Sequence, residues 1–196
     1  MNQQIDFYFD IGSPTAYFAY GELKRIASTY NADIAYEPML LGAVHKATNN
    51  VSPGAVAAKG RYMLKYDLPR YAKLYGIPFI MNPHFPINTL TIMRGCFAAR
   101  KMGVFDKYLT TLFNAMWVKG VNVGAEEILR TELIESGLDA DALLSLIESD
   151  DIKAELKLNT QKAVEKGCFG APTMFVGDEM FFGQDRVFFI EDMVKA

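Results

Sequence analysis

The chain has little cysteine: its two cysteines, Cys96 and Cys168, lie far apart in the 196-residue sequence and form no C-x-x-C pair. A chain without paired thiols in one motif lacks the reactive disulfide of a thiol–disulfide oxidoreductase. The first residues include Asp6 and lack the basic segment of a secretory signal. We therefore expect free thiols in a reducing compartment, and hence a cytoplasmic protein.

The chain also lacks a large excess of either sign of charge, and it lacks long apolar runs. The 20 Lys and Arg residues oppose 23 Asp and Glu residues, which leaves a formal net charge of -3. No apolar stretch approaches the roughly 18 residues of a membrane-spanning helix. These absences argue against a nucleic-acid partner and against insertion in a membrane. We expect a globular monomer or small oligomer, with a homodimer left open, and we assign no metal site.

A strand–helix–strand unit is predicted at the start of the chain. Apolar and polar residues alternate over 5–11, which is typical of a strand. Ser13 is a favourable N-cap and Pro14 suits the first helical position, so a helix should begin there. A second strand is predicted over 33–37 and should stop at Pro38.

The middle of the chain is predicted to be helical, and no internal repeat interrupts it. Turn residues such as Gly and Pro separate the apolar periodic stretches. The predicted helices span residues 55–64, 69–75, 89–101, 105–118, 126–136, 140–149 and 152–166.

The end of the chain returns to strands. Residues 173–176 and 179–182 flank Gly177-Asp178, a pair typical of a hairpin turn, and Asp185 is predicted to cap a closing helix.

These elements predict an α/β protein with a thioredoxin-like fold and an inserted all-helical domain. Residues 1–45 and 160–196 would form the discontinuous thioredoxin-like domain, and residues 46–159 the insertion. A two-layer α+β domain without a separate insertion is the alternative.

The turn after the first strand is the first candidate site. In a thioredoxin fold this turn carries the redox cysteines, and the helix N-terminus behind it favours a thiolate. Here the motif is Ser13-Pro14-Thr15-Ala16, so no disulfide can form within it. A hydroxyl at this position can donate a hydrogen bond to an external sulfur anion. Helix capping alone would also account for Ser13.

Two later motifs are weaker signals. Pro172 directly precedes a predicted strand, a position typical of a cis proline that faces the catalytic turn. Its neighbour Ala171 could then pair through its backbone with an extended peptide. Asp185 could bind an ammonium group, with nearby N–H groups holding a carboxylate, and the γ-glutamyl end of glutathione carries both. Helix capping with a surface Arg186 is the simpler interpretation of the last motif.

These motifs, in this order, resemble the 2-hydroxychromene-2-carboxylate isomerase family. That family is closely related to kappa-class glutathione transferases and more distantly to DsbA-type oxidoreductases. The resemblance spans nearly the whole chain. It rests on D-F-Y-F-D-I-G-S-P-T-A-Y-F-A from Asp6, N-V-S-P-x5-K-G-R-Y from Asn50, Y-G-I-P-F from Tyr75, L-F-N-A-M-W from Leu112 and F-G-A-P-T-M-F-V-G-D-E-M-F-F-G-Q-D-R from Phe169.

The resemblance implies that Ser13 is the catalytic residue and that it activates bound glutathione rather than attacking the substrate. It implies that the backbone of Ala171, before Pro172, binds the cysteinyl part of glutathione. Gln184 and Asp185 would hold the γ-glutamyl end, with Arg186 orienting Asp185.

The insertion should supply the other binding residues. By the resemblance, Asn50 and Lys59 reach glutathione and a small aromatic substrate, and Val44 and His45 lie on the substrate side. Members of the naphthalene pathway carry a Lys near His45 and an Asn near Ala55, so this chain departs from that pattern. The identity of the aromatic acid is therefore left open.

Four activities fit the sequence to different degrees. The first is a glutathione-dependent isomerase that acts by reversible thiolate addition. The second is a kappa-type transferase or peroxidase that uses the same site. A DsbA-type oxidoreductase is disfavoured by the S-P-T-A turn, and a glutathione-binding protein without activity is the fourth. His84 and Trp117 are weak candidates for a functional role.

Overall fold

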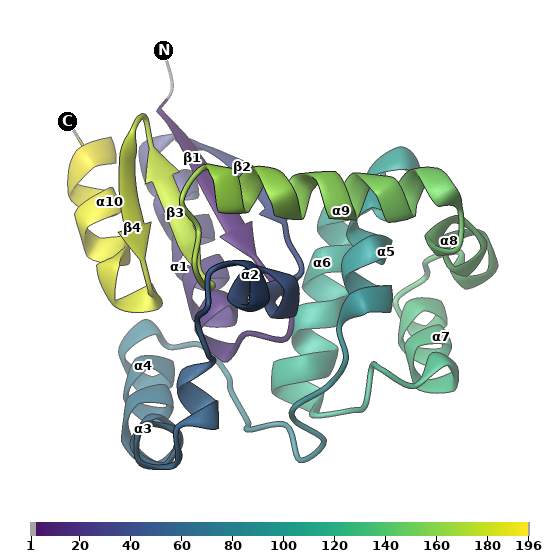
Figure 1. Ribbon diagram of the computed structural model, residues 1–196, viewed down its shortest axis with the longest axis horizontal. Coiled ribbons are helices and arrows are strands. Elements are labelled where there is room, and N and C mark those ends of the chain that lie inside the picture. The colour runs from purple at the N-terminus through teal and green to yellow at the C-terminus, as the bar shows by residue number, and fades with distance from the viewer. Residues whose placement is uncertain (1–2, 196) are drawn as a thin grey trace.

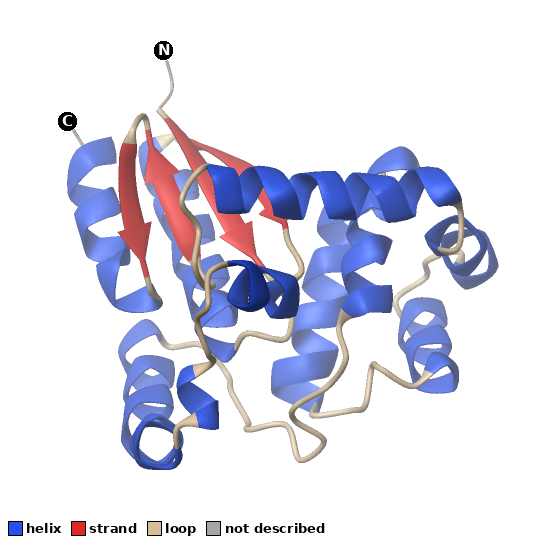
Figure 2. Cartoon of the chain, in the orientation of Figure 1, coloured by secondary structure: helices blue, strands red, loops and turns tan. Residues whose placement is uncertain are grey.

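A four-stranded mixed sheet forms the centre of the computed structural model, which describes residues 3–195 (Figure 2). The strands are β1 (Gln4–Phe9), β2 (Asp33–Pro38), β3 (Thr173–Val176) and β4 (Glu179–Phe182), and their order is β2-β1-β3-β4. β1 pairs parallel to β2 and antiparallel to β3, with Phe7 opposite Tyr36 on one side and Met174 on the other. The predicted strands are confirmed, and the sheet joins the two ends of the chain.

Helices cover both faces of this sheet (Figure 1). α1 (Pro14–Tyr30) and α10 (Val187–Val194) pack together on one face, while α9 (Asp150–Glu165) crosses the other in front of the strands. α2 (Leu41–Ala47) packs against α9 on that same side. The burial pattern of β1 follows from these two layers, because its side chains alternate between an apolar cluster on each face.

The remaining helices follow the predicted ones closely. They are α3 (Ala57–Tyr62), α4 (Leu68–Tyr75), α5 (Leu90–Lys101), α6 (Phe105–Asn114), α7 (Glu126–Glu135) and α8 (Ala140–Ile147). A π-helical turn, Met63–Asp67, joins α3 to α4 without a break, although the sequence predicts two separate helices there. A second such turn, Ala115–Lys119, extends α6.

The predicted boundary between the two domains falls inside a helix. α9 runs without interruption from Asp150 to Glu165, so residues 159 and 160 belong to the same element. One buried apolar cluster includes residues of β1, α1, α5, α6 and α8. The sheet and the helical region therefore share a core.

Two further features differ from the prediction. α2 was not expected, because Leu40 at its N-cap offers no capping side chain and Gly42 disfavours helix. Asp185 does not cap the closing helix; it lies within a 3-10 turn, Gln184–Arg186, that precedes α10.

Among residues 3–195, no helix combines the length and the apolar character that crossing a bilayer requires.

Candidate active site

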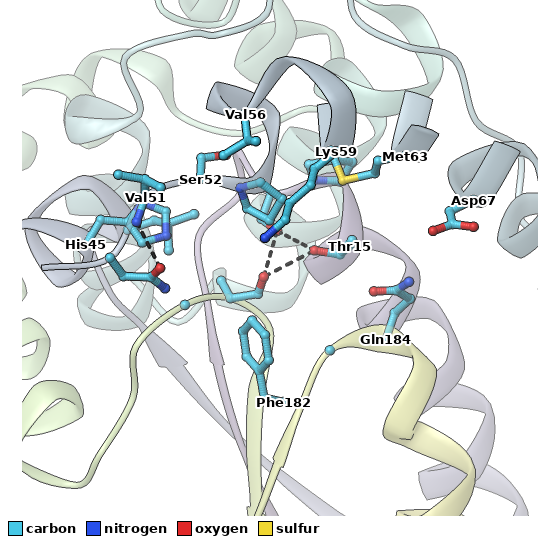
Figure 3. Close-up of a pocket in the computed structure, with 18 of the residues that line it drawn as sticks. Thr15, His45, Val51, Ser52, Val56, Lys59, Met63, Asp67, Phe182 and Gln184 are labelled. Atoms are coloured by element: carbon cyan, nitrogen blue, oxygen red, sulfur yellow. Dashed lines mark hydrogen bonds between the residues drawn. The ribbon is translucent and has the colours of Figure 1, made fainter. Parts of the chain in front are cut away.

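A cavity of about 800 Å³ opens where the β1–α1 turn, α2 and the segment before β3 meet. We call residues 10–15 and 169–172 the floor of this cavity and residues 50–67 its roof. Figure 3 shows His45 and Val51 at one end and Asp67 and Gln184 at the other, with Thr15 and Lys59 between them. A volume of this size can hold a peptide-sized ligand together with a second small molecule.

Ser13 sits at the centre of the floor, as the helix cap that the sequence predicts. Its Oγ accepts a hydrogen bond of 3.1 Å from the Ala16 N–H, and the residue is only 4% exposed. Ser13 Oγ also lies 2.9 Å from Thr15 Oγ1 and 3.2 Å from the Ala171 carbonyl oxygen. The peptide bond between Ala171 and Pro172 is cis, as predicted. The turn and the segment before β3 therefore meet at the Ser13 hydroxyl.

A buried carboxylate supports the turn from below. Asp10 is 2% exposed and accepts hydrogen bonds from the Gly12 N–H at 2.9 Å, the Leu41 N–H at 2.9 Å and the Thr89 hydroxyl at 3.0 Å. Burial raises the pKa of Asp10, and these three donors oppose that rise. Asp10 therefore ties the β1–α1 turn to the first residue of α2 and to Thr89 at the start of α5.

The backbone of the turn is fixed from a second direction. The indole N–H of Trp117, a fully buried residue, donates a 2.8 Å hydrogen bond to the Ile11 carbonyl. Gly12 has no room for a side chain, because a Cβ there would lie 2.7 Å from Thr89 Cγ2. The floor is thus a packed and hydrogen-bonded unit.

The roof differs from the floor in exposure. Val51 and Tyr62 are 60% and 51% exposed, and Lys59 is exposed as well. Lys59 extends from α3 into the cavity (Figure 3) and makes no hydrogen bond or ion pair with any residue in the range 3–195. Asn50 links the roof to the floor through a 2.8 Å hydrogen bond from Nδ2 to the Phe169 carbonyl.

His45 closes one end of the cavity from α2. Its ring is partly buried, and this burial lowers its pKa. At neutral pH the imidazole is therefore held in its uncharged form, which offers one donor and one acceptor.

The opposite end carries acidic groups and one arginine. Asp185 forms an ion pair with Arg186, and Asp67 lines the same end. Gly183 has φ +100°, and a Cβ there would lie 2.4 Å from Asp185 Oδ1, so the backbone approaches the carboxylate closely. Gly183 N–H donates to the Pro172 carbonyl at 3.0 Å, which links this end to the floor.

The structure brings most of the predicted site residues to one cavity. The cavity is lined by Ser13, His45, Asn50, Lys59, Ala171, Gln184 and Asp185. Val44 is not on its wall: it is fully buried between the sheet and α9, beside Ala163 and Cys168. Pro172 is buried behind Ala171.

Several lining residues were missed from the sequence. Asp67 and Phe85 lie outside the motifs quoted above, and Phe169 and Phe182 lie within the last motif but were given no role. Asp10, which supports the turn without lining the cavity, falls in the first motif and was also given no role. His84 is exposed outside the cavity, and Trp117 serves the core.

Neither cysteine reaches the cavity. Cys96 and Cys168 are both fully buried, and burial raises the pKa of each thiol, that of Cys168 to about 12. A buried thiol with a raised pKa is a poor nucleophile at neutral pH. Neither Cys96 nor Cys168 can therefore supply a reactive thiolate to this cavity.

Comparisons with known proteins agree with this geometry. The family model of the DSBA-like thioredoxin domain matches residues 4–195. The 2-hydroxychromene-2-carboxylate isomerase of Pseudomonas sp. (strain C18) is 35% identical over 192 residues, which cover 97% of this chain and 89% of that enzyme. Glutathione S-transferase kappa 2 of Caenorhabditis elegans is 27% identical over 198 residues, covering 93% of this chain and 88% of that protein.

A solved structure supports the same relationship. The chain superposes on a 2-hydroxychromene-2-carboxylate isomerase with a TM-score of 0.88 and 33% sequence identity, covering 98% of this chain and 94% of the other. The predicted thioredoxin-like fold is confirmed. On these grounds the chain belongs to the 2-hydroxychromene-2-carboxylate isomerase family of DsbA-like thioredoxin proteins.

Proposed function

We propose that this protein is a glutathione-dependent isomerase that acts on 2-hydroxychromene-2-carboxylate or a related unsaturated aromatic acid. The observation that carries the proposal is the Ser13 hydroxyl, which lies at a helix N-terminus on the floor of the cavity with no cysteine beside it. The isomerases and the kappa-class transferase among its relatives support the reaction and the cofactor.

The lining of the cavity fits glutathione in charge. Glutathione carries one ammonium group and two carboxylates, and the cavity offers both signs. Asp185 and Asp67 lie at one end for the ammonium, and Lys59 is a cation without an ion-pair partner within the described chain. We assign Gln184 and Asp185 to the γ-glutamyl end, the Ala171 backbone to the cysteinyl part, and Asn50 and Lys59 to the rest.

The residues of the floor would favour the thiolate of the bound ligand. The first turn of α1 leaves backbone N–H groups without intrahelical partners, and the helix dipole favours negative charge there. Ser13 can add one charge-assisted hydrogen bond. A thiol with a pKa of about 8.5 is about 3% ionised at pH 7, and lowering that pKa by about two units requires roughly 2.7 kcal/mol. One such hydrogen bond and the helix terminus together supply energies of this size.

When bound, glutathione would supply a thiolate that adds to an unsaturated carbon and later leaves, so that rotation about the former double bond becomes easy. Ser13 holds the sulfur as an anion before and after this step. His45 and Lys59 face the acid: Lys59 can pair with its carboxylate, and the uncharged His45 can hydrogen-bond to its oxygen.

A kappa-type glutathione transferase or peroxidase is the second candidate, and the 27% identity to the kappa protein favours it. The two activities differ in their use of glutathione. An isomerase regenerates it in each cycle, while a transferase or peroxidase consumes it.

The decisive test compares the wild type with Ser13→Ala. We expect bound glutathione to show thiolate absorbance at about 240 nm near neutral pH in the wild type and to lose it in the variant. Turnover of the aromatic acid should fall about 100-fold to 1000-fold, as on removal of one anion-stabilising donor. Total glutathione should stay constant during turnover. Consumption of glutathione would favour the transferase, and absence of binding would overturn the proposal.

A further inference from the structure

Three oxygen atoms on the floor form a triangle whose sides all have hydrogen-bond lengths. Ser13 Oγ, Thr15 Oγ1 and the Ala171 carbonyl oxygen lie 2.9, 3.2 and 3.1 Å apart along its three sides (Figure 3). The two hydroxyls bring two protons to three contacts, and the carbonyl brings none. One of the three contacts therefore always lacks a proton. Which contact that is changes when either hydroxyl rotates.

The Ser13 hydroxyl has one proton, and the carbonyl competes for it. Ser13 Oγ already accepts from the Ala16 N–H, so its proton is its only means of reaching a ligand. That proton is within reach of the Ala171 carbonyl oxygen, which lies 3.2 Å from Ser13 Oγ. Turning the proton toward a sulfur anion withdraws this donor from Ala171.

Thr15 offers a replacement donor. Its hydroxyl lies 3.1 Å from the same carbonyl and also lines the cavity. Within residues 3–195 the Ala171 carbonyl has no other hydrogen-bond donor than these two hydroxyls. With Thr15 in place, the carbonyl stays hydrogen-bonded after Ser13 turns away. Alternatively the Thr15 hydroxyl can donate a hydrogen bond to Ser13 Oγ, which polarises the Ser13 O–H bond and strengthens Ser13 as a donor.

We propose that Thr15 is a positioning residue that releases the Ser13 proton for the sulfur anion of bound glutathione. This inference rests on the proposed function, because it assigns a role toward the same ligand. It concerns a residue outside the Ser13, Asn50, Lys59, Gln184 and Asp185 set. The proposed role requires a hydroxyl group at position 15, and a side chain of the same shape without a hydroxyl cannot fulfil it.

Two substitutions at this position separate the hydroxyl from the shape. Thr15→Val keeps the branched side chain and removes the hydroxyl, while Thr15→Ser keeps the hydroxyl and removes a methyl group. Thr29→Val is the matched control, because it removes a threonine hydroxyl from the same helix, where Thr29 donates only to the Arg25 carbonyl. Melting curves of all variants establish that each one folds.

The measurement is the pKa of the bound glutathione thiol, followed by absorbance at about 240 nm as a function of pH. In Thr15→Val we expect this pKa to rise by about one unit, which lowers the ratio of thiolate to thiol about tenfold. Thr15→Ser and Thr29→Val should match the wild type. Binding of S-methylglutathione, which has no thiol proton to lose, should be unchanged in Thr15→Val.

Each outcome bears on a different part of the argument. If the bound thiol keeps an ordinary pKa in the wild type, the proposed function itself fails. If the wild type lowers that pKa and Thr15→Val lowers it equally, only the role of Thr15 is overturned. If Thr15→Val also loses S-methylglutathione binding, or Thr15→Ser does not restore the thiolate, Thr15 acts through shape and the inference is wrong.

Discussion

The floor and the roof of the cavity are built in opposite ways. On the floor, Asp10 and Ser13 are almost completely buried, and the Asp10 carboxyl group, the Ser13 hydroxyl and the Ile11 carbonyl each have a hydrogen-bond partner. In the roof, Lys59 and Tyr62 are exposed. The one side-chain hydrogen bond described above between roof and floor comes from Asn50. The floor is therefore fixed before a ligand arrives, whereas the roof can adapt to it.

This difference separates two tasks. Stabilising an anion requires donors that are already oriented, because reorienting them during the reaction costs free energy. Selecting a substrate requires surfaces that contact its variable parts. We therefore expect substitutions in the floor to affect folding and thiol ionisation, and substitutions in the roof to affect binding alone.

The largest loss of stability should follow Asp10→Ala. This change leaves the Gly12 and Leu41 N–H groups and the Thr89 hydroxyl without their acceptor, and burial keeps water from replacing it. We expect the free energy of unfolding to fall by about 3 kcal/mol, measured by urea denaturation. Asp10→Asn should lose less, because it keeps one acceptor. A loss below about 0.5 kcal/mol in Asp10→Ala would contradict the idea of a fixed floor.

A smaller loss is expected for Gly183→Ala at the acidic end. The φ of +100° disfavours any side chain, and the new Cβ would displace the Asp185 carboxylate. We expect a loss of about 2 kcal/mol together with weaker glutathione binding. Gly177→Ala is the matched control: its φ is +60°, but its Cβ would meet nothing within 4 Å. That variant should be strained without any loss of glutathione affinity.

Lys59→Met tests the roof. The methionine keeps the apolar stem and removes the charge. We therefore expect the affinity for glutathione to fall about tenfold and the free energy of unfolding to change by less than about 0.5 kcal/mol. Calorimetric titration at two salt concentrations should show a weaker salt dependence in the variant. Lys73→Met, an exposed lysine of α4 outside the cavity wall, is the control. Marked unfolding of Lys59→Met would show that roof and floor are not separate.

The smallest effect concerns pH. Because burial lowers the pKa of His45 in the folded protein, the unfolded chain binds the proton more readily. The folded protein is therefore most favoured above the unfolded pKa of about 6.5, and it loses stability as pH falls from there to the lower pKa of His45 in the folded state. His45→Gln should remove this part of the slope of unfolding free energy against pH. His84→Gln should leave it in place, since His45 is retained. Equal slopes in the wild type and His45→Gln would show that burial of His45 does not contribute to the pH dependence of stability.

Local patterns predicted most of the fold. Alternation identified the strands, apolar periodicity identified the long helices, and Ser13-Pro14 located the start of α1 correctly. The predicted capping by Asp185 was wrong, since a 3-10 turn intervenes before α10. Val44, expected beside the substrate, lies in the core, because its neighbour His45 occupies the cavity side of α2.

What the sequence determined by itself is the chemistry of the turn: a serine at a helix N-terminus with no cysteine beside it. What only the tertiary structure decided is how that turn is held and completed. α2 begins at Leu41, where the capping acceptor is Asp10 from 31 positions earlier in the chain. Thr15 meets Ala171 across 156 positions. Local propensity carries no information about such contacts, because each depends on two distant segments brought together by the shared core.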